Sequence, residues 1–255
     1  MKRKTYLTII WSITLCVILF SSTQCTIKSK NFFSDFWKNF VIDFDDSDNQ
    51  DWENNLSPFD SDKWDSVTSN STQVRLSEFS QIVVDANIMT LTIEEGNSWN
   101  LRCDFSHKEL QPDYKMNNNT LTVRQHLSSK PKVASKKCDL VITVPKNTSL
   151  EDVDVKINVG EIEISSVDIN KLAVNLNIGE IDIDKVQFDT FTGKTNIGEL
   201  SIDNLNNLED YEVFAEVNLG DIKIENDHFG RKYRQKISSE KKIDCSVNIG
   251  EISIN

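Results

Sequence analysis

Apolar residues recur at every second position through the last hundred residues of the chain, and within them nearly the same motif occurs five times. The copies read NVGEIEI from Asn158, NIGEIDI from Asn177, NIGELSI from Asn196, NLGDIKI from Asn218 and NIGEISI from Asn248. A period of two with one apolar side is typical of a half-buried strand. The motif glycines stand at positions 160, 179, 198, 220 and 250, and such a repeat predicts coils that bury their apolar sides against one another. We therefore expect an all-β, single-stranded β-solenoid with rungs of about 19–22 residues.

Each copy shifts its alternation by one residue at the glycine. Val159 and Ile162, for example, are three positions apart although both are apolar. An extra residue at a Gly–acid pair indicates a bulge or a corner, and glycine suits it because glycine adopts positive φ readily. Three columns meet at this shift: the glycines Gly160, Gly179, Gly198, Gly220 and Gly250; the asparagines Asn158, Asn177, Asn196, Asn218 and Asn248; and the acids Glu161, Glu180, Glu199, Asp221 and Glu251.

The asparagine column is interpreted as a ladder of side-chain amides that hydrogen-bond from coil to coil. The acidic column would place neighbouring carboxylates about 5 Å apart, which is unfavourable unless solvent, salt or a cation screens the charge. This column is therefore either a solvated edge that discourages aggregation or a weak surface for divalent cations. No dedicated metal site and no cofactor are predicted, because the sequence has no zinc spacing and no nucleotide-binding motif.

The beginning of the chain has a different character. Three basic residues, Lys2 to Lys4, precede an apolar run that ends near Phe20, so residues 1–25 are expected to be a signal sequence or a membrane anchor. A single span with the β domain outside the cell, a secreted form and a lipid anchor at Cys25 all fit this pattern. Residues 26–72 are predicted to be an aromatic and then acidic linker, and residues 73–255 the β domain, with short strand signals at 79–84, 90–93 and 120–123.

Charge and composition narrow the function. The formal net charge is −12 and the pI is about 4.8, which argues against a nucleic-acid partner. The three histidines are scattered and no hydrolase motif is present, so the chain is not expected to be an enzyme. Cys103 and Cys138 lie in β-rich segments of a domain expected to be exported, where they could form a disulfide.

One segment near the end of the chain is basic. Residues 226–242 make the last step of the repeat, from Gly220 to Gly250, longer than the others, and an insertion in a solenoid maps to a loop on one face, often the binding face. The candidate binding residues are Arg231, Lys232, Tyr233, Arg234 and Lys236. They would contact an anionic cell-wall polymer, lipid headgroups or an envelope protein; the alternative is a solvated loop that offsets the acidic column.

The stretch DLVITVPKNTSLEDVDVKINVGEIEIS, which starts at Asp139, resembles a bacterial family of β-strand-repeat domains of unknown function labelled putative adhesins. The ITVP strand, the NTSLEDV connector and the repeated units carry the likeness, which spans about residues 73–255. Members of that family are typically anchored to or secreted from the cell envelope. The resemblance implies a solenoid-like all-β fold without established catalytic residues.

The leading hypothesis is thus a non-catalytic surface or interaction module of the cell envelope, attached to the membrane through its N-terminal segment. The alternatives are an extracytoplasmic accessory of an envelope-stress signalling system and a scaffold that self-associates end to end. Since the fifth repeat ends at Ile254, the last coil is expected to expose an edge that pairs with another molecule or is covered by the aromatic segment.

Overall fold

The computed structural model describes residues 65–66, 71–125, 127 and 137–255. The chain divides into two units, Met1–Asp62 and Lys63–Asn255, and every described residue belongs to the second. The expected anchor in residues 1–25 and most of the expected linker therefore lie outside the described residues. Within the described ranges, no helix has the length and apolarity that a membrane span requires. Strands begin at Asp65, before the expected start of the β domain at residue 73.

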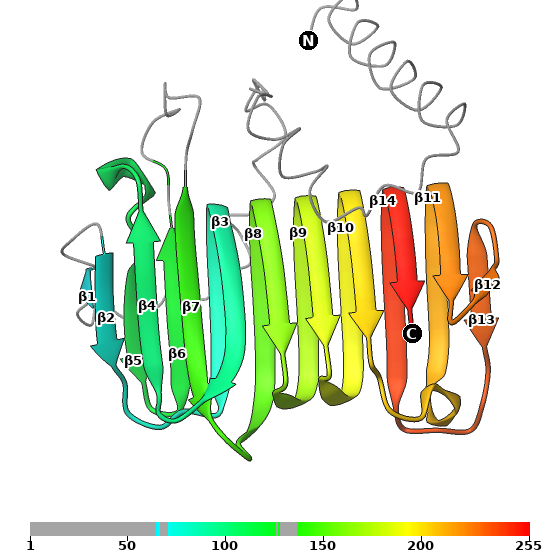
Figure 1. Cartoon of the computed structure of the whole chain (residues 1–255), viewed down its shortest axis with the longest axis horizontal. Helices are drawn as coiled ribbons and strands as arrows, with labels where there is room; N and C mark the ends of the chain where they lie inside the picture. The colour runs from blue at the N-terminus through cyan, green and yellow to red at the C-terminus, as the bar shows by residue number, and fades with distance from the viewer. Residues whose placement is uncertain (1–64, 67–70, 126, 128–136) are drawn as a thin grey trace, which may run out of the picture. The chain divides into compact units, whose positions relative to one another are not determined.

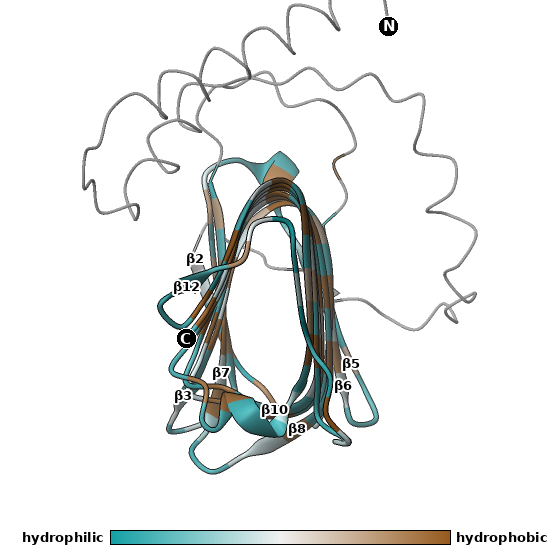
Figure 2. Ribbon diagram, turned by 90° about the vertical axis from the view of Figure 1, so that its right-hand side faces the viewer, coloured by the Kyte–Doolittle hydropathy of each residue, from teal (hydrophilic) through white to brown (hydrophobic). Residues whose placement is uncertain are grey.

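The described unit is all-β, which confirms that part of the expected fold class and is consistent with a β-solenoid-like fold, and five long strands form its repeated rungs. Figure 2 shows that these strands rise along one side of an arch, bend at its top and descend along the other side. Adjacent rungs are parallel and keep their repeats in register, so that Gly160 pairs with Gly179 and Gly179 with Gly198. The rungs are β8 (Ser149–Ser165), β9 (Asp168–Asp184), β10 (Gln187–Asp203), β11 (Glu212–Ile224) and β14 (Lys242–Ile254).

The order of the rungs in space differs from their order in the sequence. Strand β14, red in Figure 1, lies between β10 and β11 and is parallel to both. Gly250 accordingly pairs with Gly198 on one side and with Gly220 on the other. The last rung is therefore β11, and the expectation that the fifth repeat exposes an edge is wrong because both edges of β14 are paired.

A sixth rung precedes the five that the repeat identifies. Strand β3 (Gln81–Gly96) pairs in parallel with β8 along both sides of the arch. Its segment Asn87–Ile93 lies opposite the first repeat, with Met89 paired to Gly160 and Thr90 to Glu161. The sequence indicates only separate short strands here, because a methionine and a threonine replace the glycine and the acid.

Beyond β3 the two sides of the arch continue as separate sets of strands. One side continues through β6 (Thr120–Gln125), β5 (Asp113–Asn117) and β1 (Asp65–Ser66), and the other through β7 (Cys138–Pro145), β4 (Asn100–Phe105) and β2 (Ser71–Arg75). Strands β6 and β7 are parallel to β3, whereas the outer strands pair antiparallel. A short 3-10 helix, η4 (Lys108–Leu110), follows β4.

The opposite end of the stack is covered by two short strands. Both strands pair antiparallel with β11. Strand β13 (Lys232–Gln235) pairs with its first half, and strand β12 (Asp227–His228) pairs with its second half. A second 3-10 helix, η5 (Leu208–Asp210), lies in the connection from β10 to β11. Short edge strands that carry basic side chains discourage further pairing, so this end of the sheet is protected.

One continuous apolar core fills the inside of the arch. The third rung departs from the usual Val and Ile pattern, and its residues compensate one another in volume. A Cβ atom on Gly193 would lie 2.6 Å from the Phe191 ring, so that ring occupies the space of the missing side chain. Thr195 follows on the same inward column, and its buried hydroxyl has no hydrogen-bond partner in the described part of the chain.

Candidate functional site

The basic residues singled out in the sequence lie in the segment that covers the β11 edge. We name residues 227–237 the cap segment. It was expected to be a loop, but most of it is strand or pairs with β11: Phe229 N–H donates to the Ile222 carbonyl oxygen at 2.8 Å, and Val217 N–H donates to that of Arg231 at 2.9 Å. The candidate binding residues are therefore held on a sheet edge, which positions them more rigidly than a free loop would.

Strand β13 presents its two faces differently. Lys232 and Arg234 are exposed, and the Lys232 ammonium lies 2.8 Å from the Glu216 carboxylate on the facing strand. Tyr233 is partly buried, packs against the core and contacts Phe229 with ring centroids 4.5 Å apart. The alternation thus places cations outside, while Tyr233 helps to close the end of the core.

From Phe229 onward, every charged side chain of the cap segment is positive. Between Phe229 and Ile237 the chain has four cationic side chains and no carboxylate. Arg231, Arg234 and Lys236 are exposed, and none of them forms an ion pair with another described residue. The three cations are therefore available to an anionic partner.

Exposed apolar side chains gather near the same end. Of the four large apolar residues that are exposed in the described ranges, three lie on or beside the cap segment: Leu219 (49% exposed), Phe229 (40%) and Ile237 (36%). Leu219 lies on the corner of the last rung, which the chain from Phe229 to Arg231 follows. Mixed basic, aromatic and aliphatic surfaces are typical of interaction sites.

The corner of the arch carries the three columns of the repeat. The five corner glycines have φ between +139° and +152°, and each approaches the backbone of the neighbouring rung closely. The asparagines form a ladder in which every Nδ2 donates to the next Oδ1 at 2.8–3.1 Å, in the order Asn218, Asn248, Asn196, Asn177 and Asn158. This arrangement explains both residue types structurally, without a ligand.

The acidic column follows the same spatial order, so Glu251 lies between Glu199 and Asp221. Burial, and then the charges of Glu199 and Glu161, raise the pKa of Glu180 to about 7. The pKa of Glu199 is raised for the same reasons, burial first and Glu251 second. Asp221 differs, because a hydrogen bond with His228 of β12 lowers its pKa. No group of three or more acidic, histidine or cysteine side chains in the described residues is arranged to hold a metal ion, and a weak cation surface on this column stays a prediction.

The two cysteines considered for a disulfide are neighbours on the inside of the fold. Strands β4 and β7 are antiparallel, with Cys103 opposite Leu140 and Cys138 opposite Phe105, so the cysteines lie on a diagonal. Both are buried free thiols, so the structure does not form the disulfide considered from sequence. The hydrogen bond with Cys138, together with burial, raises the pKa of Cys103. A thiol held protonated in this way is a poor nucleophile.

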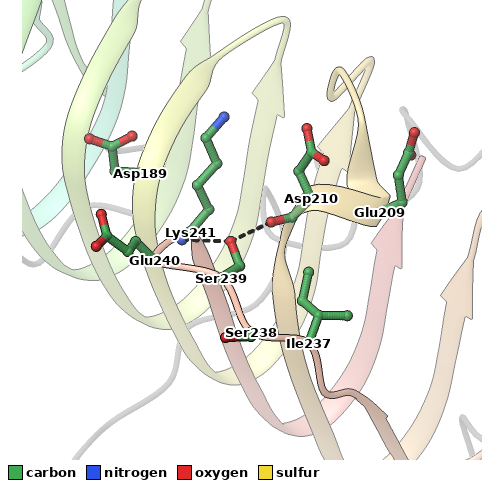
Figure 3. Close-up of a pocket in the computed structure, with 8 residues that line it drawn as sticks. All are labelled: Asp189, Glu209, Asp210, Ile237, Ser238, Ser239, Glu240 and Lys241. Carbon is green, nitrogen blue, oxygen red and sulfur yellow. Dashed lines mark hydrogen bonds between the residues drawn. The ribbon is translucent and has the colours of Figure 1, made fainter.

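A surface hollow of about 640 Å³ lies beside the chain that leads into β14 (Figure 3). Its lining is Asp189, Glu209, Asp210, Ile237, Ser238, Ser239, Glu240 and Lys241. The Ser239 hydroxyl donates to the Asp210 carbonyl oxygen at 2.6 Å and accepts from the Lys241 backbone N–H at 3.0 Å. The hydroxyl therefore fixes the local backbone, and no histidine lies in the lining to activate it.

These features define an all-β domain of stacked rungs whose last rung is covered by a basic segment. The sequence matches the family Toastrack DUF4097 over residues 79–231. The chain therefore belongs to the Toastrack DUF4097 family. No curated protein matches it in sequence.

One solved structure agrees with the fold. A protein described as a putative cell adhesion protein from Clostridium sporogenes ATCC 15579 is similar with a TM-score of 0.55 and 15% identity, over 72% of this chain and 97% of that one. A putative adhesin from Bacteroides fragilis NCTC 9343 has a TM-score of 0.31 and 12% identity, over 76% of this chain and 98% of that one. A putative adhesin from Parabacteroides merdae ATCC 43184 has a TM-score of 0.36 and 11% identity, over 72% of this chain and 80% of that one. At 15% identity the likeness to the Clostridium sporogenes structure concerns the fold alone.

Proposed function

We propose that this chain is a non-catalytic interaction module of the bacterial cell envelope that binds an anionic envelope polymer through its cap segment. The observation that carries the proposal is the run of four cations without a carboxylate between Phe229 and Ile237, on a chain of net charge −12. On an otherwise acidic surface, a basic patch directs an anionic partner to one end of the domain.

The cap segment suits a polymer better than a small anion. Lys232 and Arg234 lie on an edge strand, and Arg231 and Lys236 flank its two ends. The four cations therefore follow a line rather than surround a cavity, which matches charges spaced along a chain. Exposed Phe229 and Leu219 beside them add apolar contact to the electrostatic attraction. Arginine also forms paired hydrogen bonds with phosphate and carboxylate groups.

Three further points support an envelope role. The basic and apolar N-terminal segment is typical of exported or anchored proteins, and attachment there leaves the β domain on the outer side of the membrane. The family and the Clostridium sporogenes structure, described as a putative cell adhesion protein, accord with a surface module. End-to-end stacking is less favourable, because the β11 edge is already paired with β12 and β13.

The test is sedimentation of the full chain with isolated cell walls, and separately with anionic lipid vesicles, at two salt concentrations. The test variant replaces Arg231, Lys232, Arg234 and Lys236 with serine. The matched control replaces Lys146, Lys156, Lys171 and Lys194, which are exposed elsewhere on the domain, so both variants lose four positive charges.

We expect the unchanged chain and the control to bind cell walls in a salt-sensitive manner, and the test variant to lose binding. Equal loss in both variants would show that only net charge matters and would overturn the assignment of the site. Binding to vesicles but not to cell walls would replace the polymer with a lipid surface.

A further inference from the structure

The position of β14 supports an inference that does not depend on the proposed function. The chain forms β10 and then β11, yet β14, which follows both, lies between them. Its residues from Lys242 to Ile254 pair in register with Thr190–Ile202 of β10 and with Glu212–Ile224 of β11. Strand β11 is thus held one rung farther from β10 than its repeat requires, and the space between them is a slot that β14 fills.

The connection from β10 to β11 is built to leave this slot. The links between β8 and β9 and between β9 and β10 have two residues each, whereas residues 204–211 connect β10 to β11. Three buried side chains anchor this connection: Leu205, Leu208 and Tyr211. The longer connection explains why Gly198 and Gly220 are farther apart in the sequence than Gly179 and Gly198 are.

Contacts that do not involve β14 fix the width of the slot. The Tyr211 hydroxyl donates to the Phe188 carbonyl oxygen at 2.8 Å, and the two rings lie 5.5 Å apart. Gln235 of β13 donates to the Leu208 and Tyr211 carbonyl oxygens at 3.1 and 2.9 Å. These bonds join β10, the connection and the cap segment, so they hold the beginning of β11 beside Tyr211 without a contribution from β14.

An empty slot would expose two parallel strand edges with a shared pattern. Both walls carry the repeat, with Asn196, Gly198 and Glu199 on one side and Asn218, Gly220 and Asp221 on the other. Unpaired edges of this kind accept an added strand that matches their hydrogen bonds and side-chain columns. The strand that matches both walls in register is Lys242–Ile254 itself.

The residues that lead into β14 are the hinge of such an exchange, and they are released when two hydrogen bonds break: Ser239 hydroxyl to the Asp210 carbonyl oxygen, and Glu212 N–H to the Lys241 carbonyl oxygen. Residues 236–241 follow β13 and are mostly exposed, and residues 237–241 line the hollow shown in Figure 3. A connection of six residues spans about 20 Å when extended. Short hinges of this kind favour exchange of a terminal element between identical molecules.

We propose that the slot between β10 and β11 is a strand-acceptor site that takes Lys242–Ile254 from a second copy of this chain, which gives a strand-exchanged dimer. The exchanged strand makes the same pairs in the dimer as it makes in the single chain. Exchange therefore costs little in contacts, and it links two domains side by side through their hinges rather than through their covered ends.

Thr192 provides a test, because it pairs with Ala173 of β9 on one side and with Asp244 of β14 on the other. Full-length T192C and D244C chains are purified separately, mixed at high concentration, warmed below the unfolding midpoint and oxidised. Mass spectrometry then identifies the cross-linked residues, which separates this link from any that involves the native cysteines. In the matched control, A173C is mixed with T192C, since these residues are paired in the chain but lie on rungs that no hinge releases.

A covalent dimer linked through 192 and 244, together with the absence of a 173–192 link between chains, supports strand exchange. Excess synthetic peptide Lys242–Ile254 should reduce the yield of that dimer by competing for the slot. The T192C/D244C double variant, cross-linked within one chain, shows that the geometry permits the bond. If the double variant closes but the mixed single variants give no more 192–244 dimer than the control pair gives 173–192 dimer, the proposal is wrong.

Discussion

Replacement of Gly179 by alanine tests how tightly the rungs are stacked at the corner. Gly179 has φ of +139°, a conformation that residues with a side chain rarely adopt. A Cβ atom there would lie 1.7 Å from the Gly160 carbonyl oxygen. This obstacle is backbone of the neighbouring rung, so no rotation of a side chain can relieve it, and the corner of β9 must move away from β8.

The magnitude follows from three contributions. Strain at such a backbone conformation costs about 1–3 kcal/mol. Displacement of the corner also weakens the two hydrogen bonds that Asn177 makes in the ladder, each of which contributes about 1 kcal/mol. The smaller conformational entropy of alanine in the unfolded chain offsets about 0.4–1 kcal/mol. The expected loss in the free energy of unfolding is therefore about 3 kcal/mol.

Urea unfolding followed by circular dichroism measures this loss, and Gly230→Ala is the matched control. Gly230 also has positive φ, +65°, but nothing lies within 4 Å of an added Cβ atom. The control should lose only the cost of a left-handed conformation, about 1–2 kcal/mol. If Gly179→Ala destabilises the protein no more than Gly230→Ala, the close approach of the rungs is not what requires glycine at the corner.

Three other predictions concern single side chains. Thr195→Val should stabilise the protein by about 1 kcal/mol in urea unfolding, because it removes a buried hydroxyl that has no partner among the described residues, whereas Thr192→Val on the exposed face should have little effect. Asn196→Ala removes two bonds of the ladder and Asn218→Ala only one, so the first should lower the unfolding midpoint more; equal effects would mean that the ladder contributes little. Burial and neighbouring carboxylates raise the pKa of Glu180 from its usual value of 4.5 to about 7. Between these two pH values the folded protein therefore binds more protons than the unfolded chain. The stabilisation that protonated Glu180 gives is complete below pH 4.5 and is lost as the pH rises through 7. Glu180→Gln should therefore raise the unfolding midpoint at pH 8 and reduce its dependence on pH between 5 and 8, and an unchanged dependence would contradict the assignment.

The alternating columns are the part of the fold that the sequence predicts well. The rungs repeat their inward positions, which are apolar except at Gly193 and Thr195 of β10, and the one-residue shift at Gly160 and its equivalents marks the corner of the arch. The asparagine ladder also follows from the repeat, because residues at equal positions in parallel rungs become neighbours. These inferences depend on local periodicity, which the sequence states directly.

Rung order could not be predicted in the same way. Every copy of the repeat is compatible with every other, so the motif does not specify which copies are adjacent. The lengthened step between Gly198 and Gly220 is the available signal, since the extra length lets the chain pass over the slot for β14. The rung at Asn87 escaped detection because Met89 and Thr90 replace the two residues that define the motif.

The cap segment illustrates a second limit. Its basic composition marked it as a candidate site, but a composition does not state whether a segment pairs with a sheet edge. The pairing of Lys232–Gln235 with Val213–Glu216 depends on β11 being the last rung, which in turn depends on the insertion of β14. The position of the candidate site is thus a consequence of topology, whereas its residues are visible in the sequence.

The most direct test of the account is hydrogen exchange measured by mass spectrometry on the full chain, alone and with isolated cell walls at low salt. We expect slower exchange in peptides that cover residues 227–237 and in the neighbouring corner at Leu219, with little change at the glutamate corner of β8 and β9. Slower exchange centred on Glu161 and Glu180, with the cap segment unchanged, would contradict the account and assign the interaction to the acidic column.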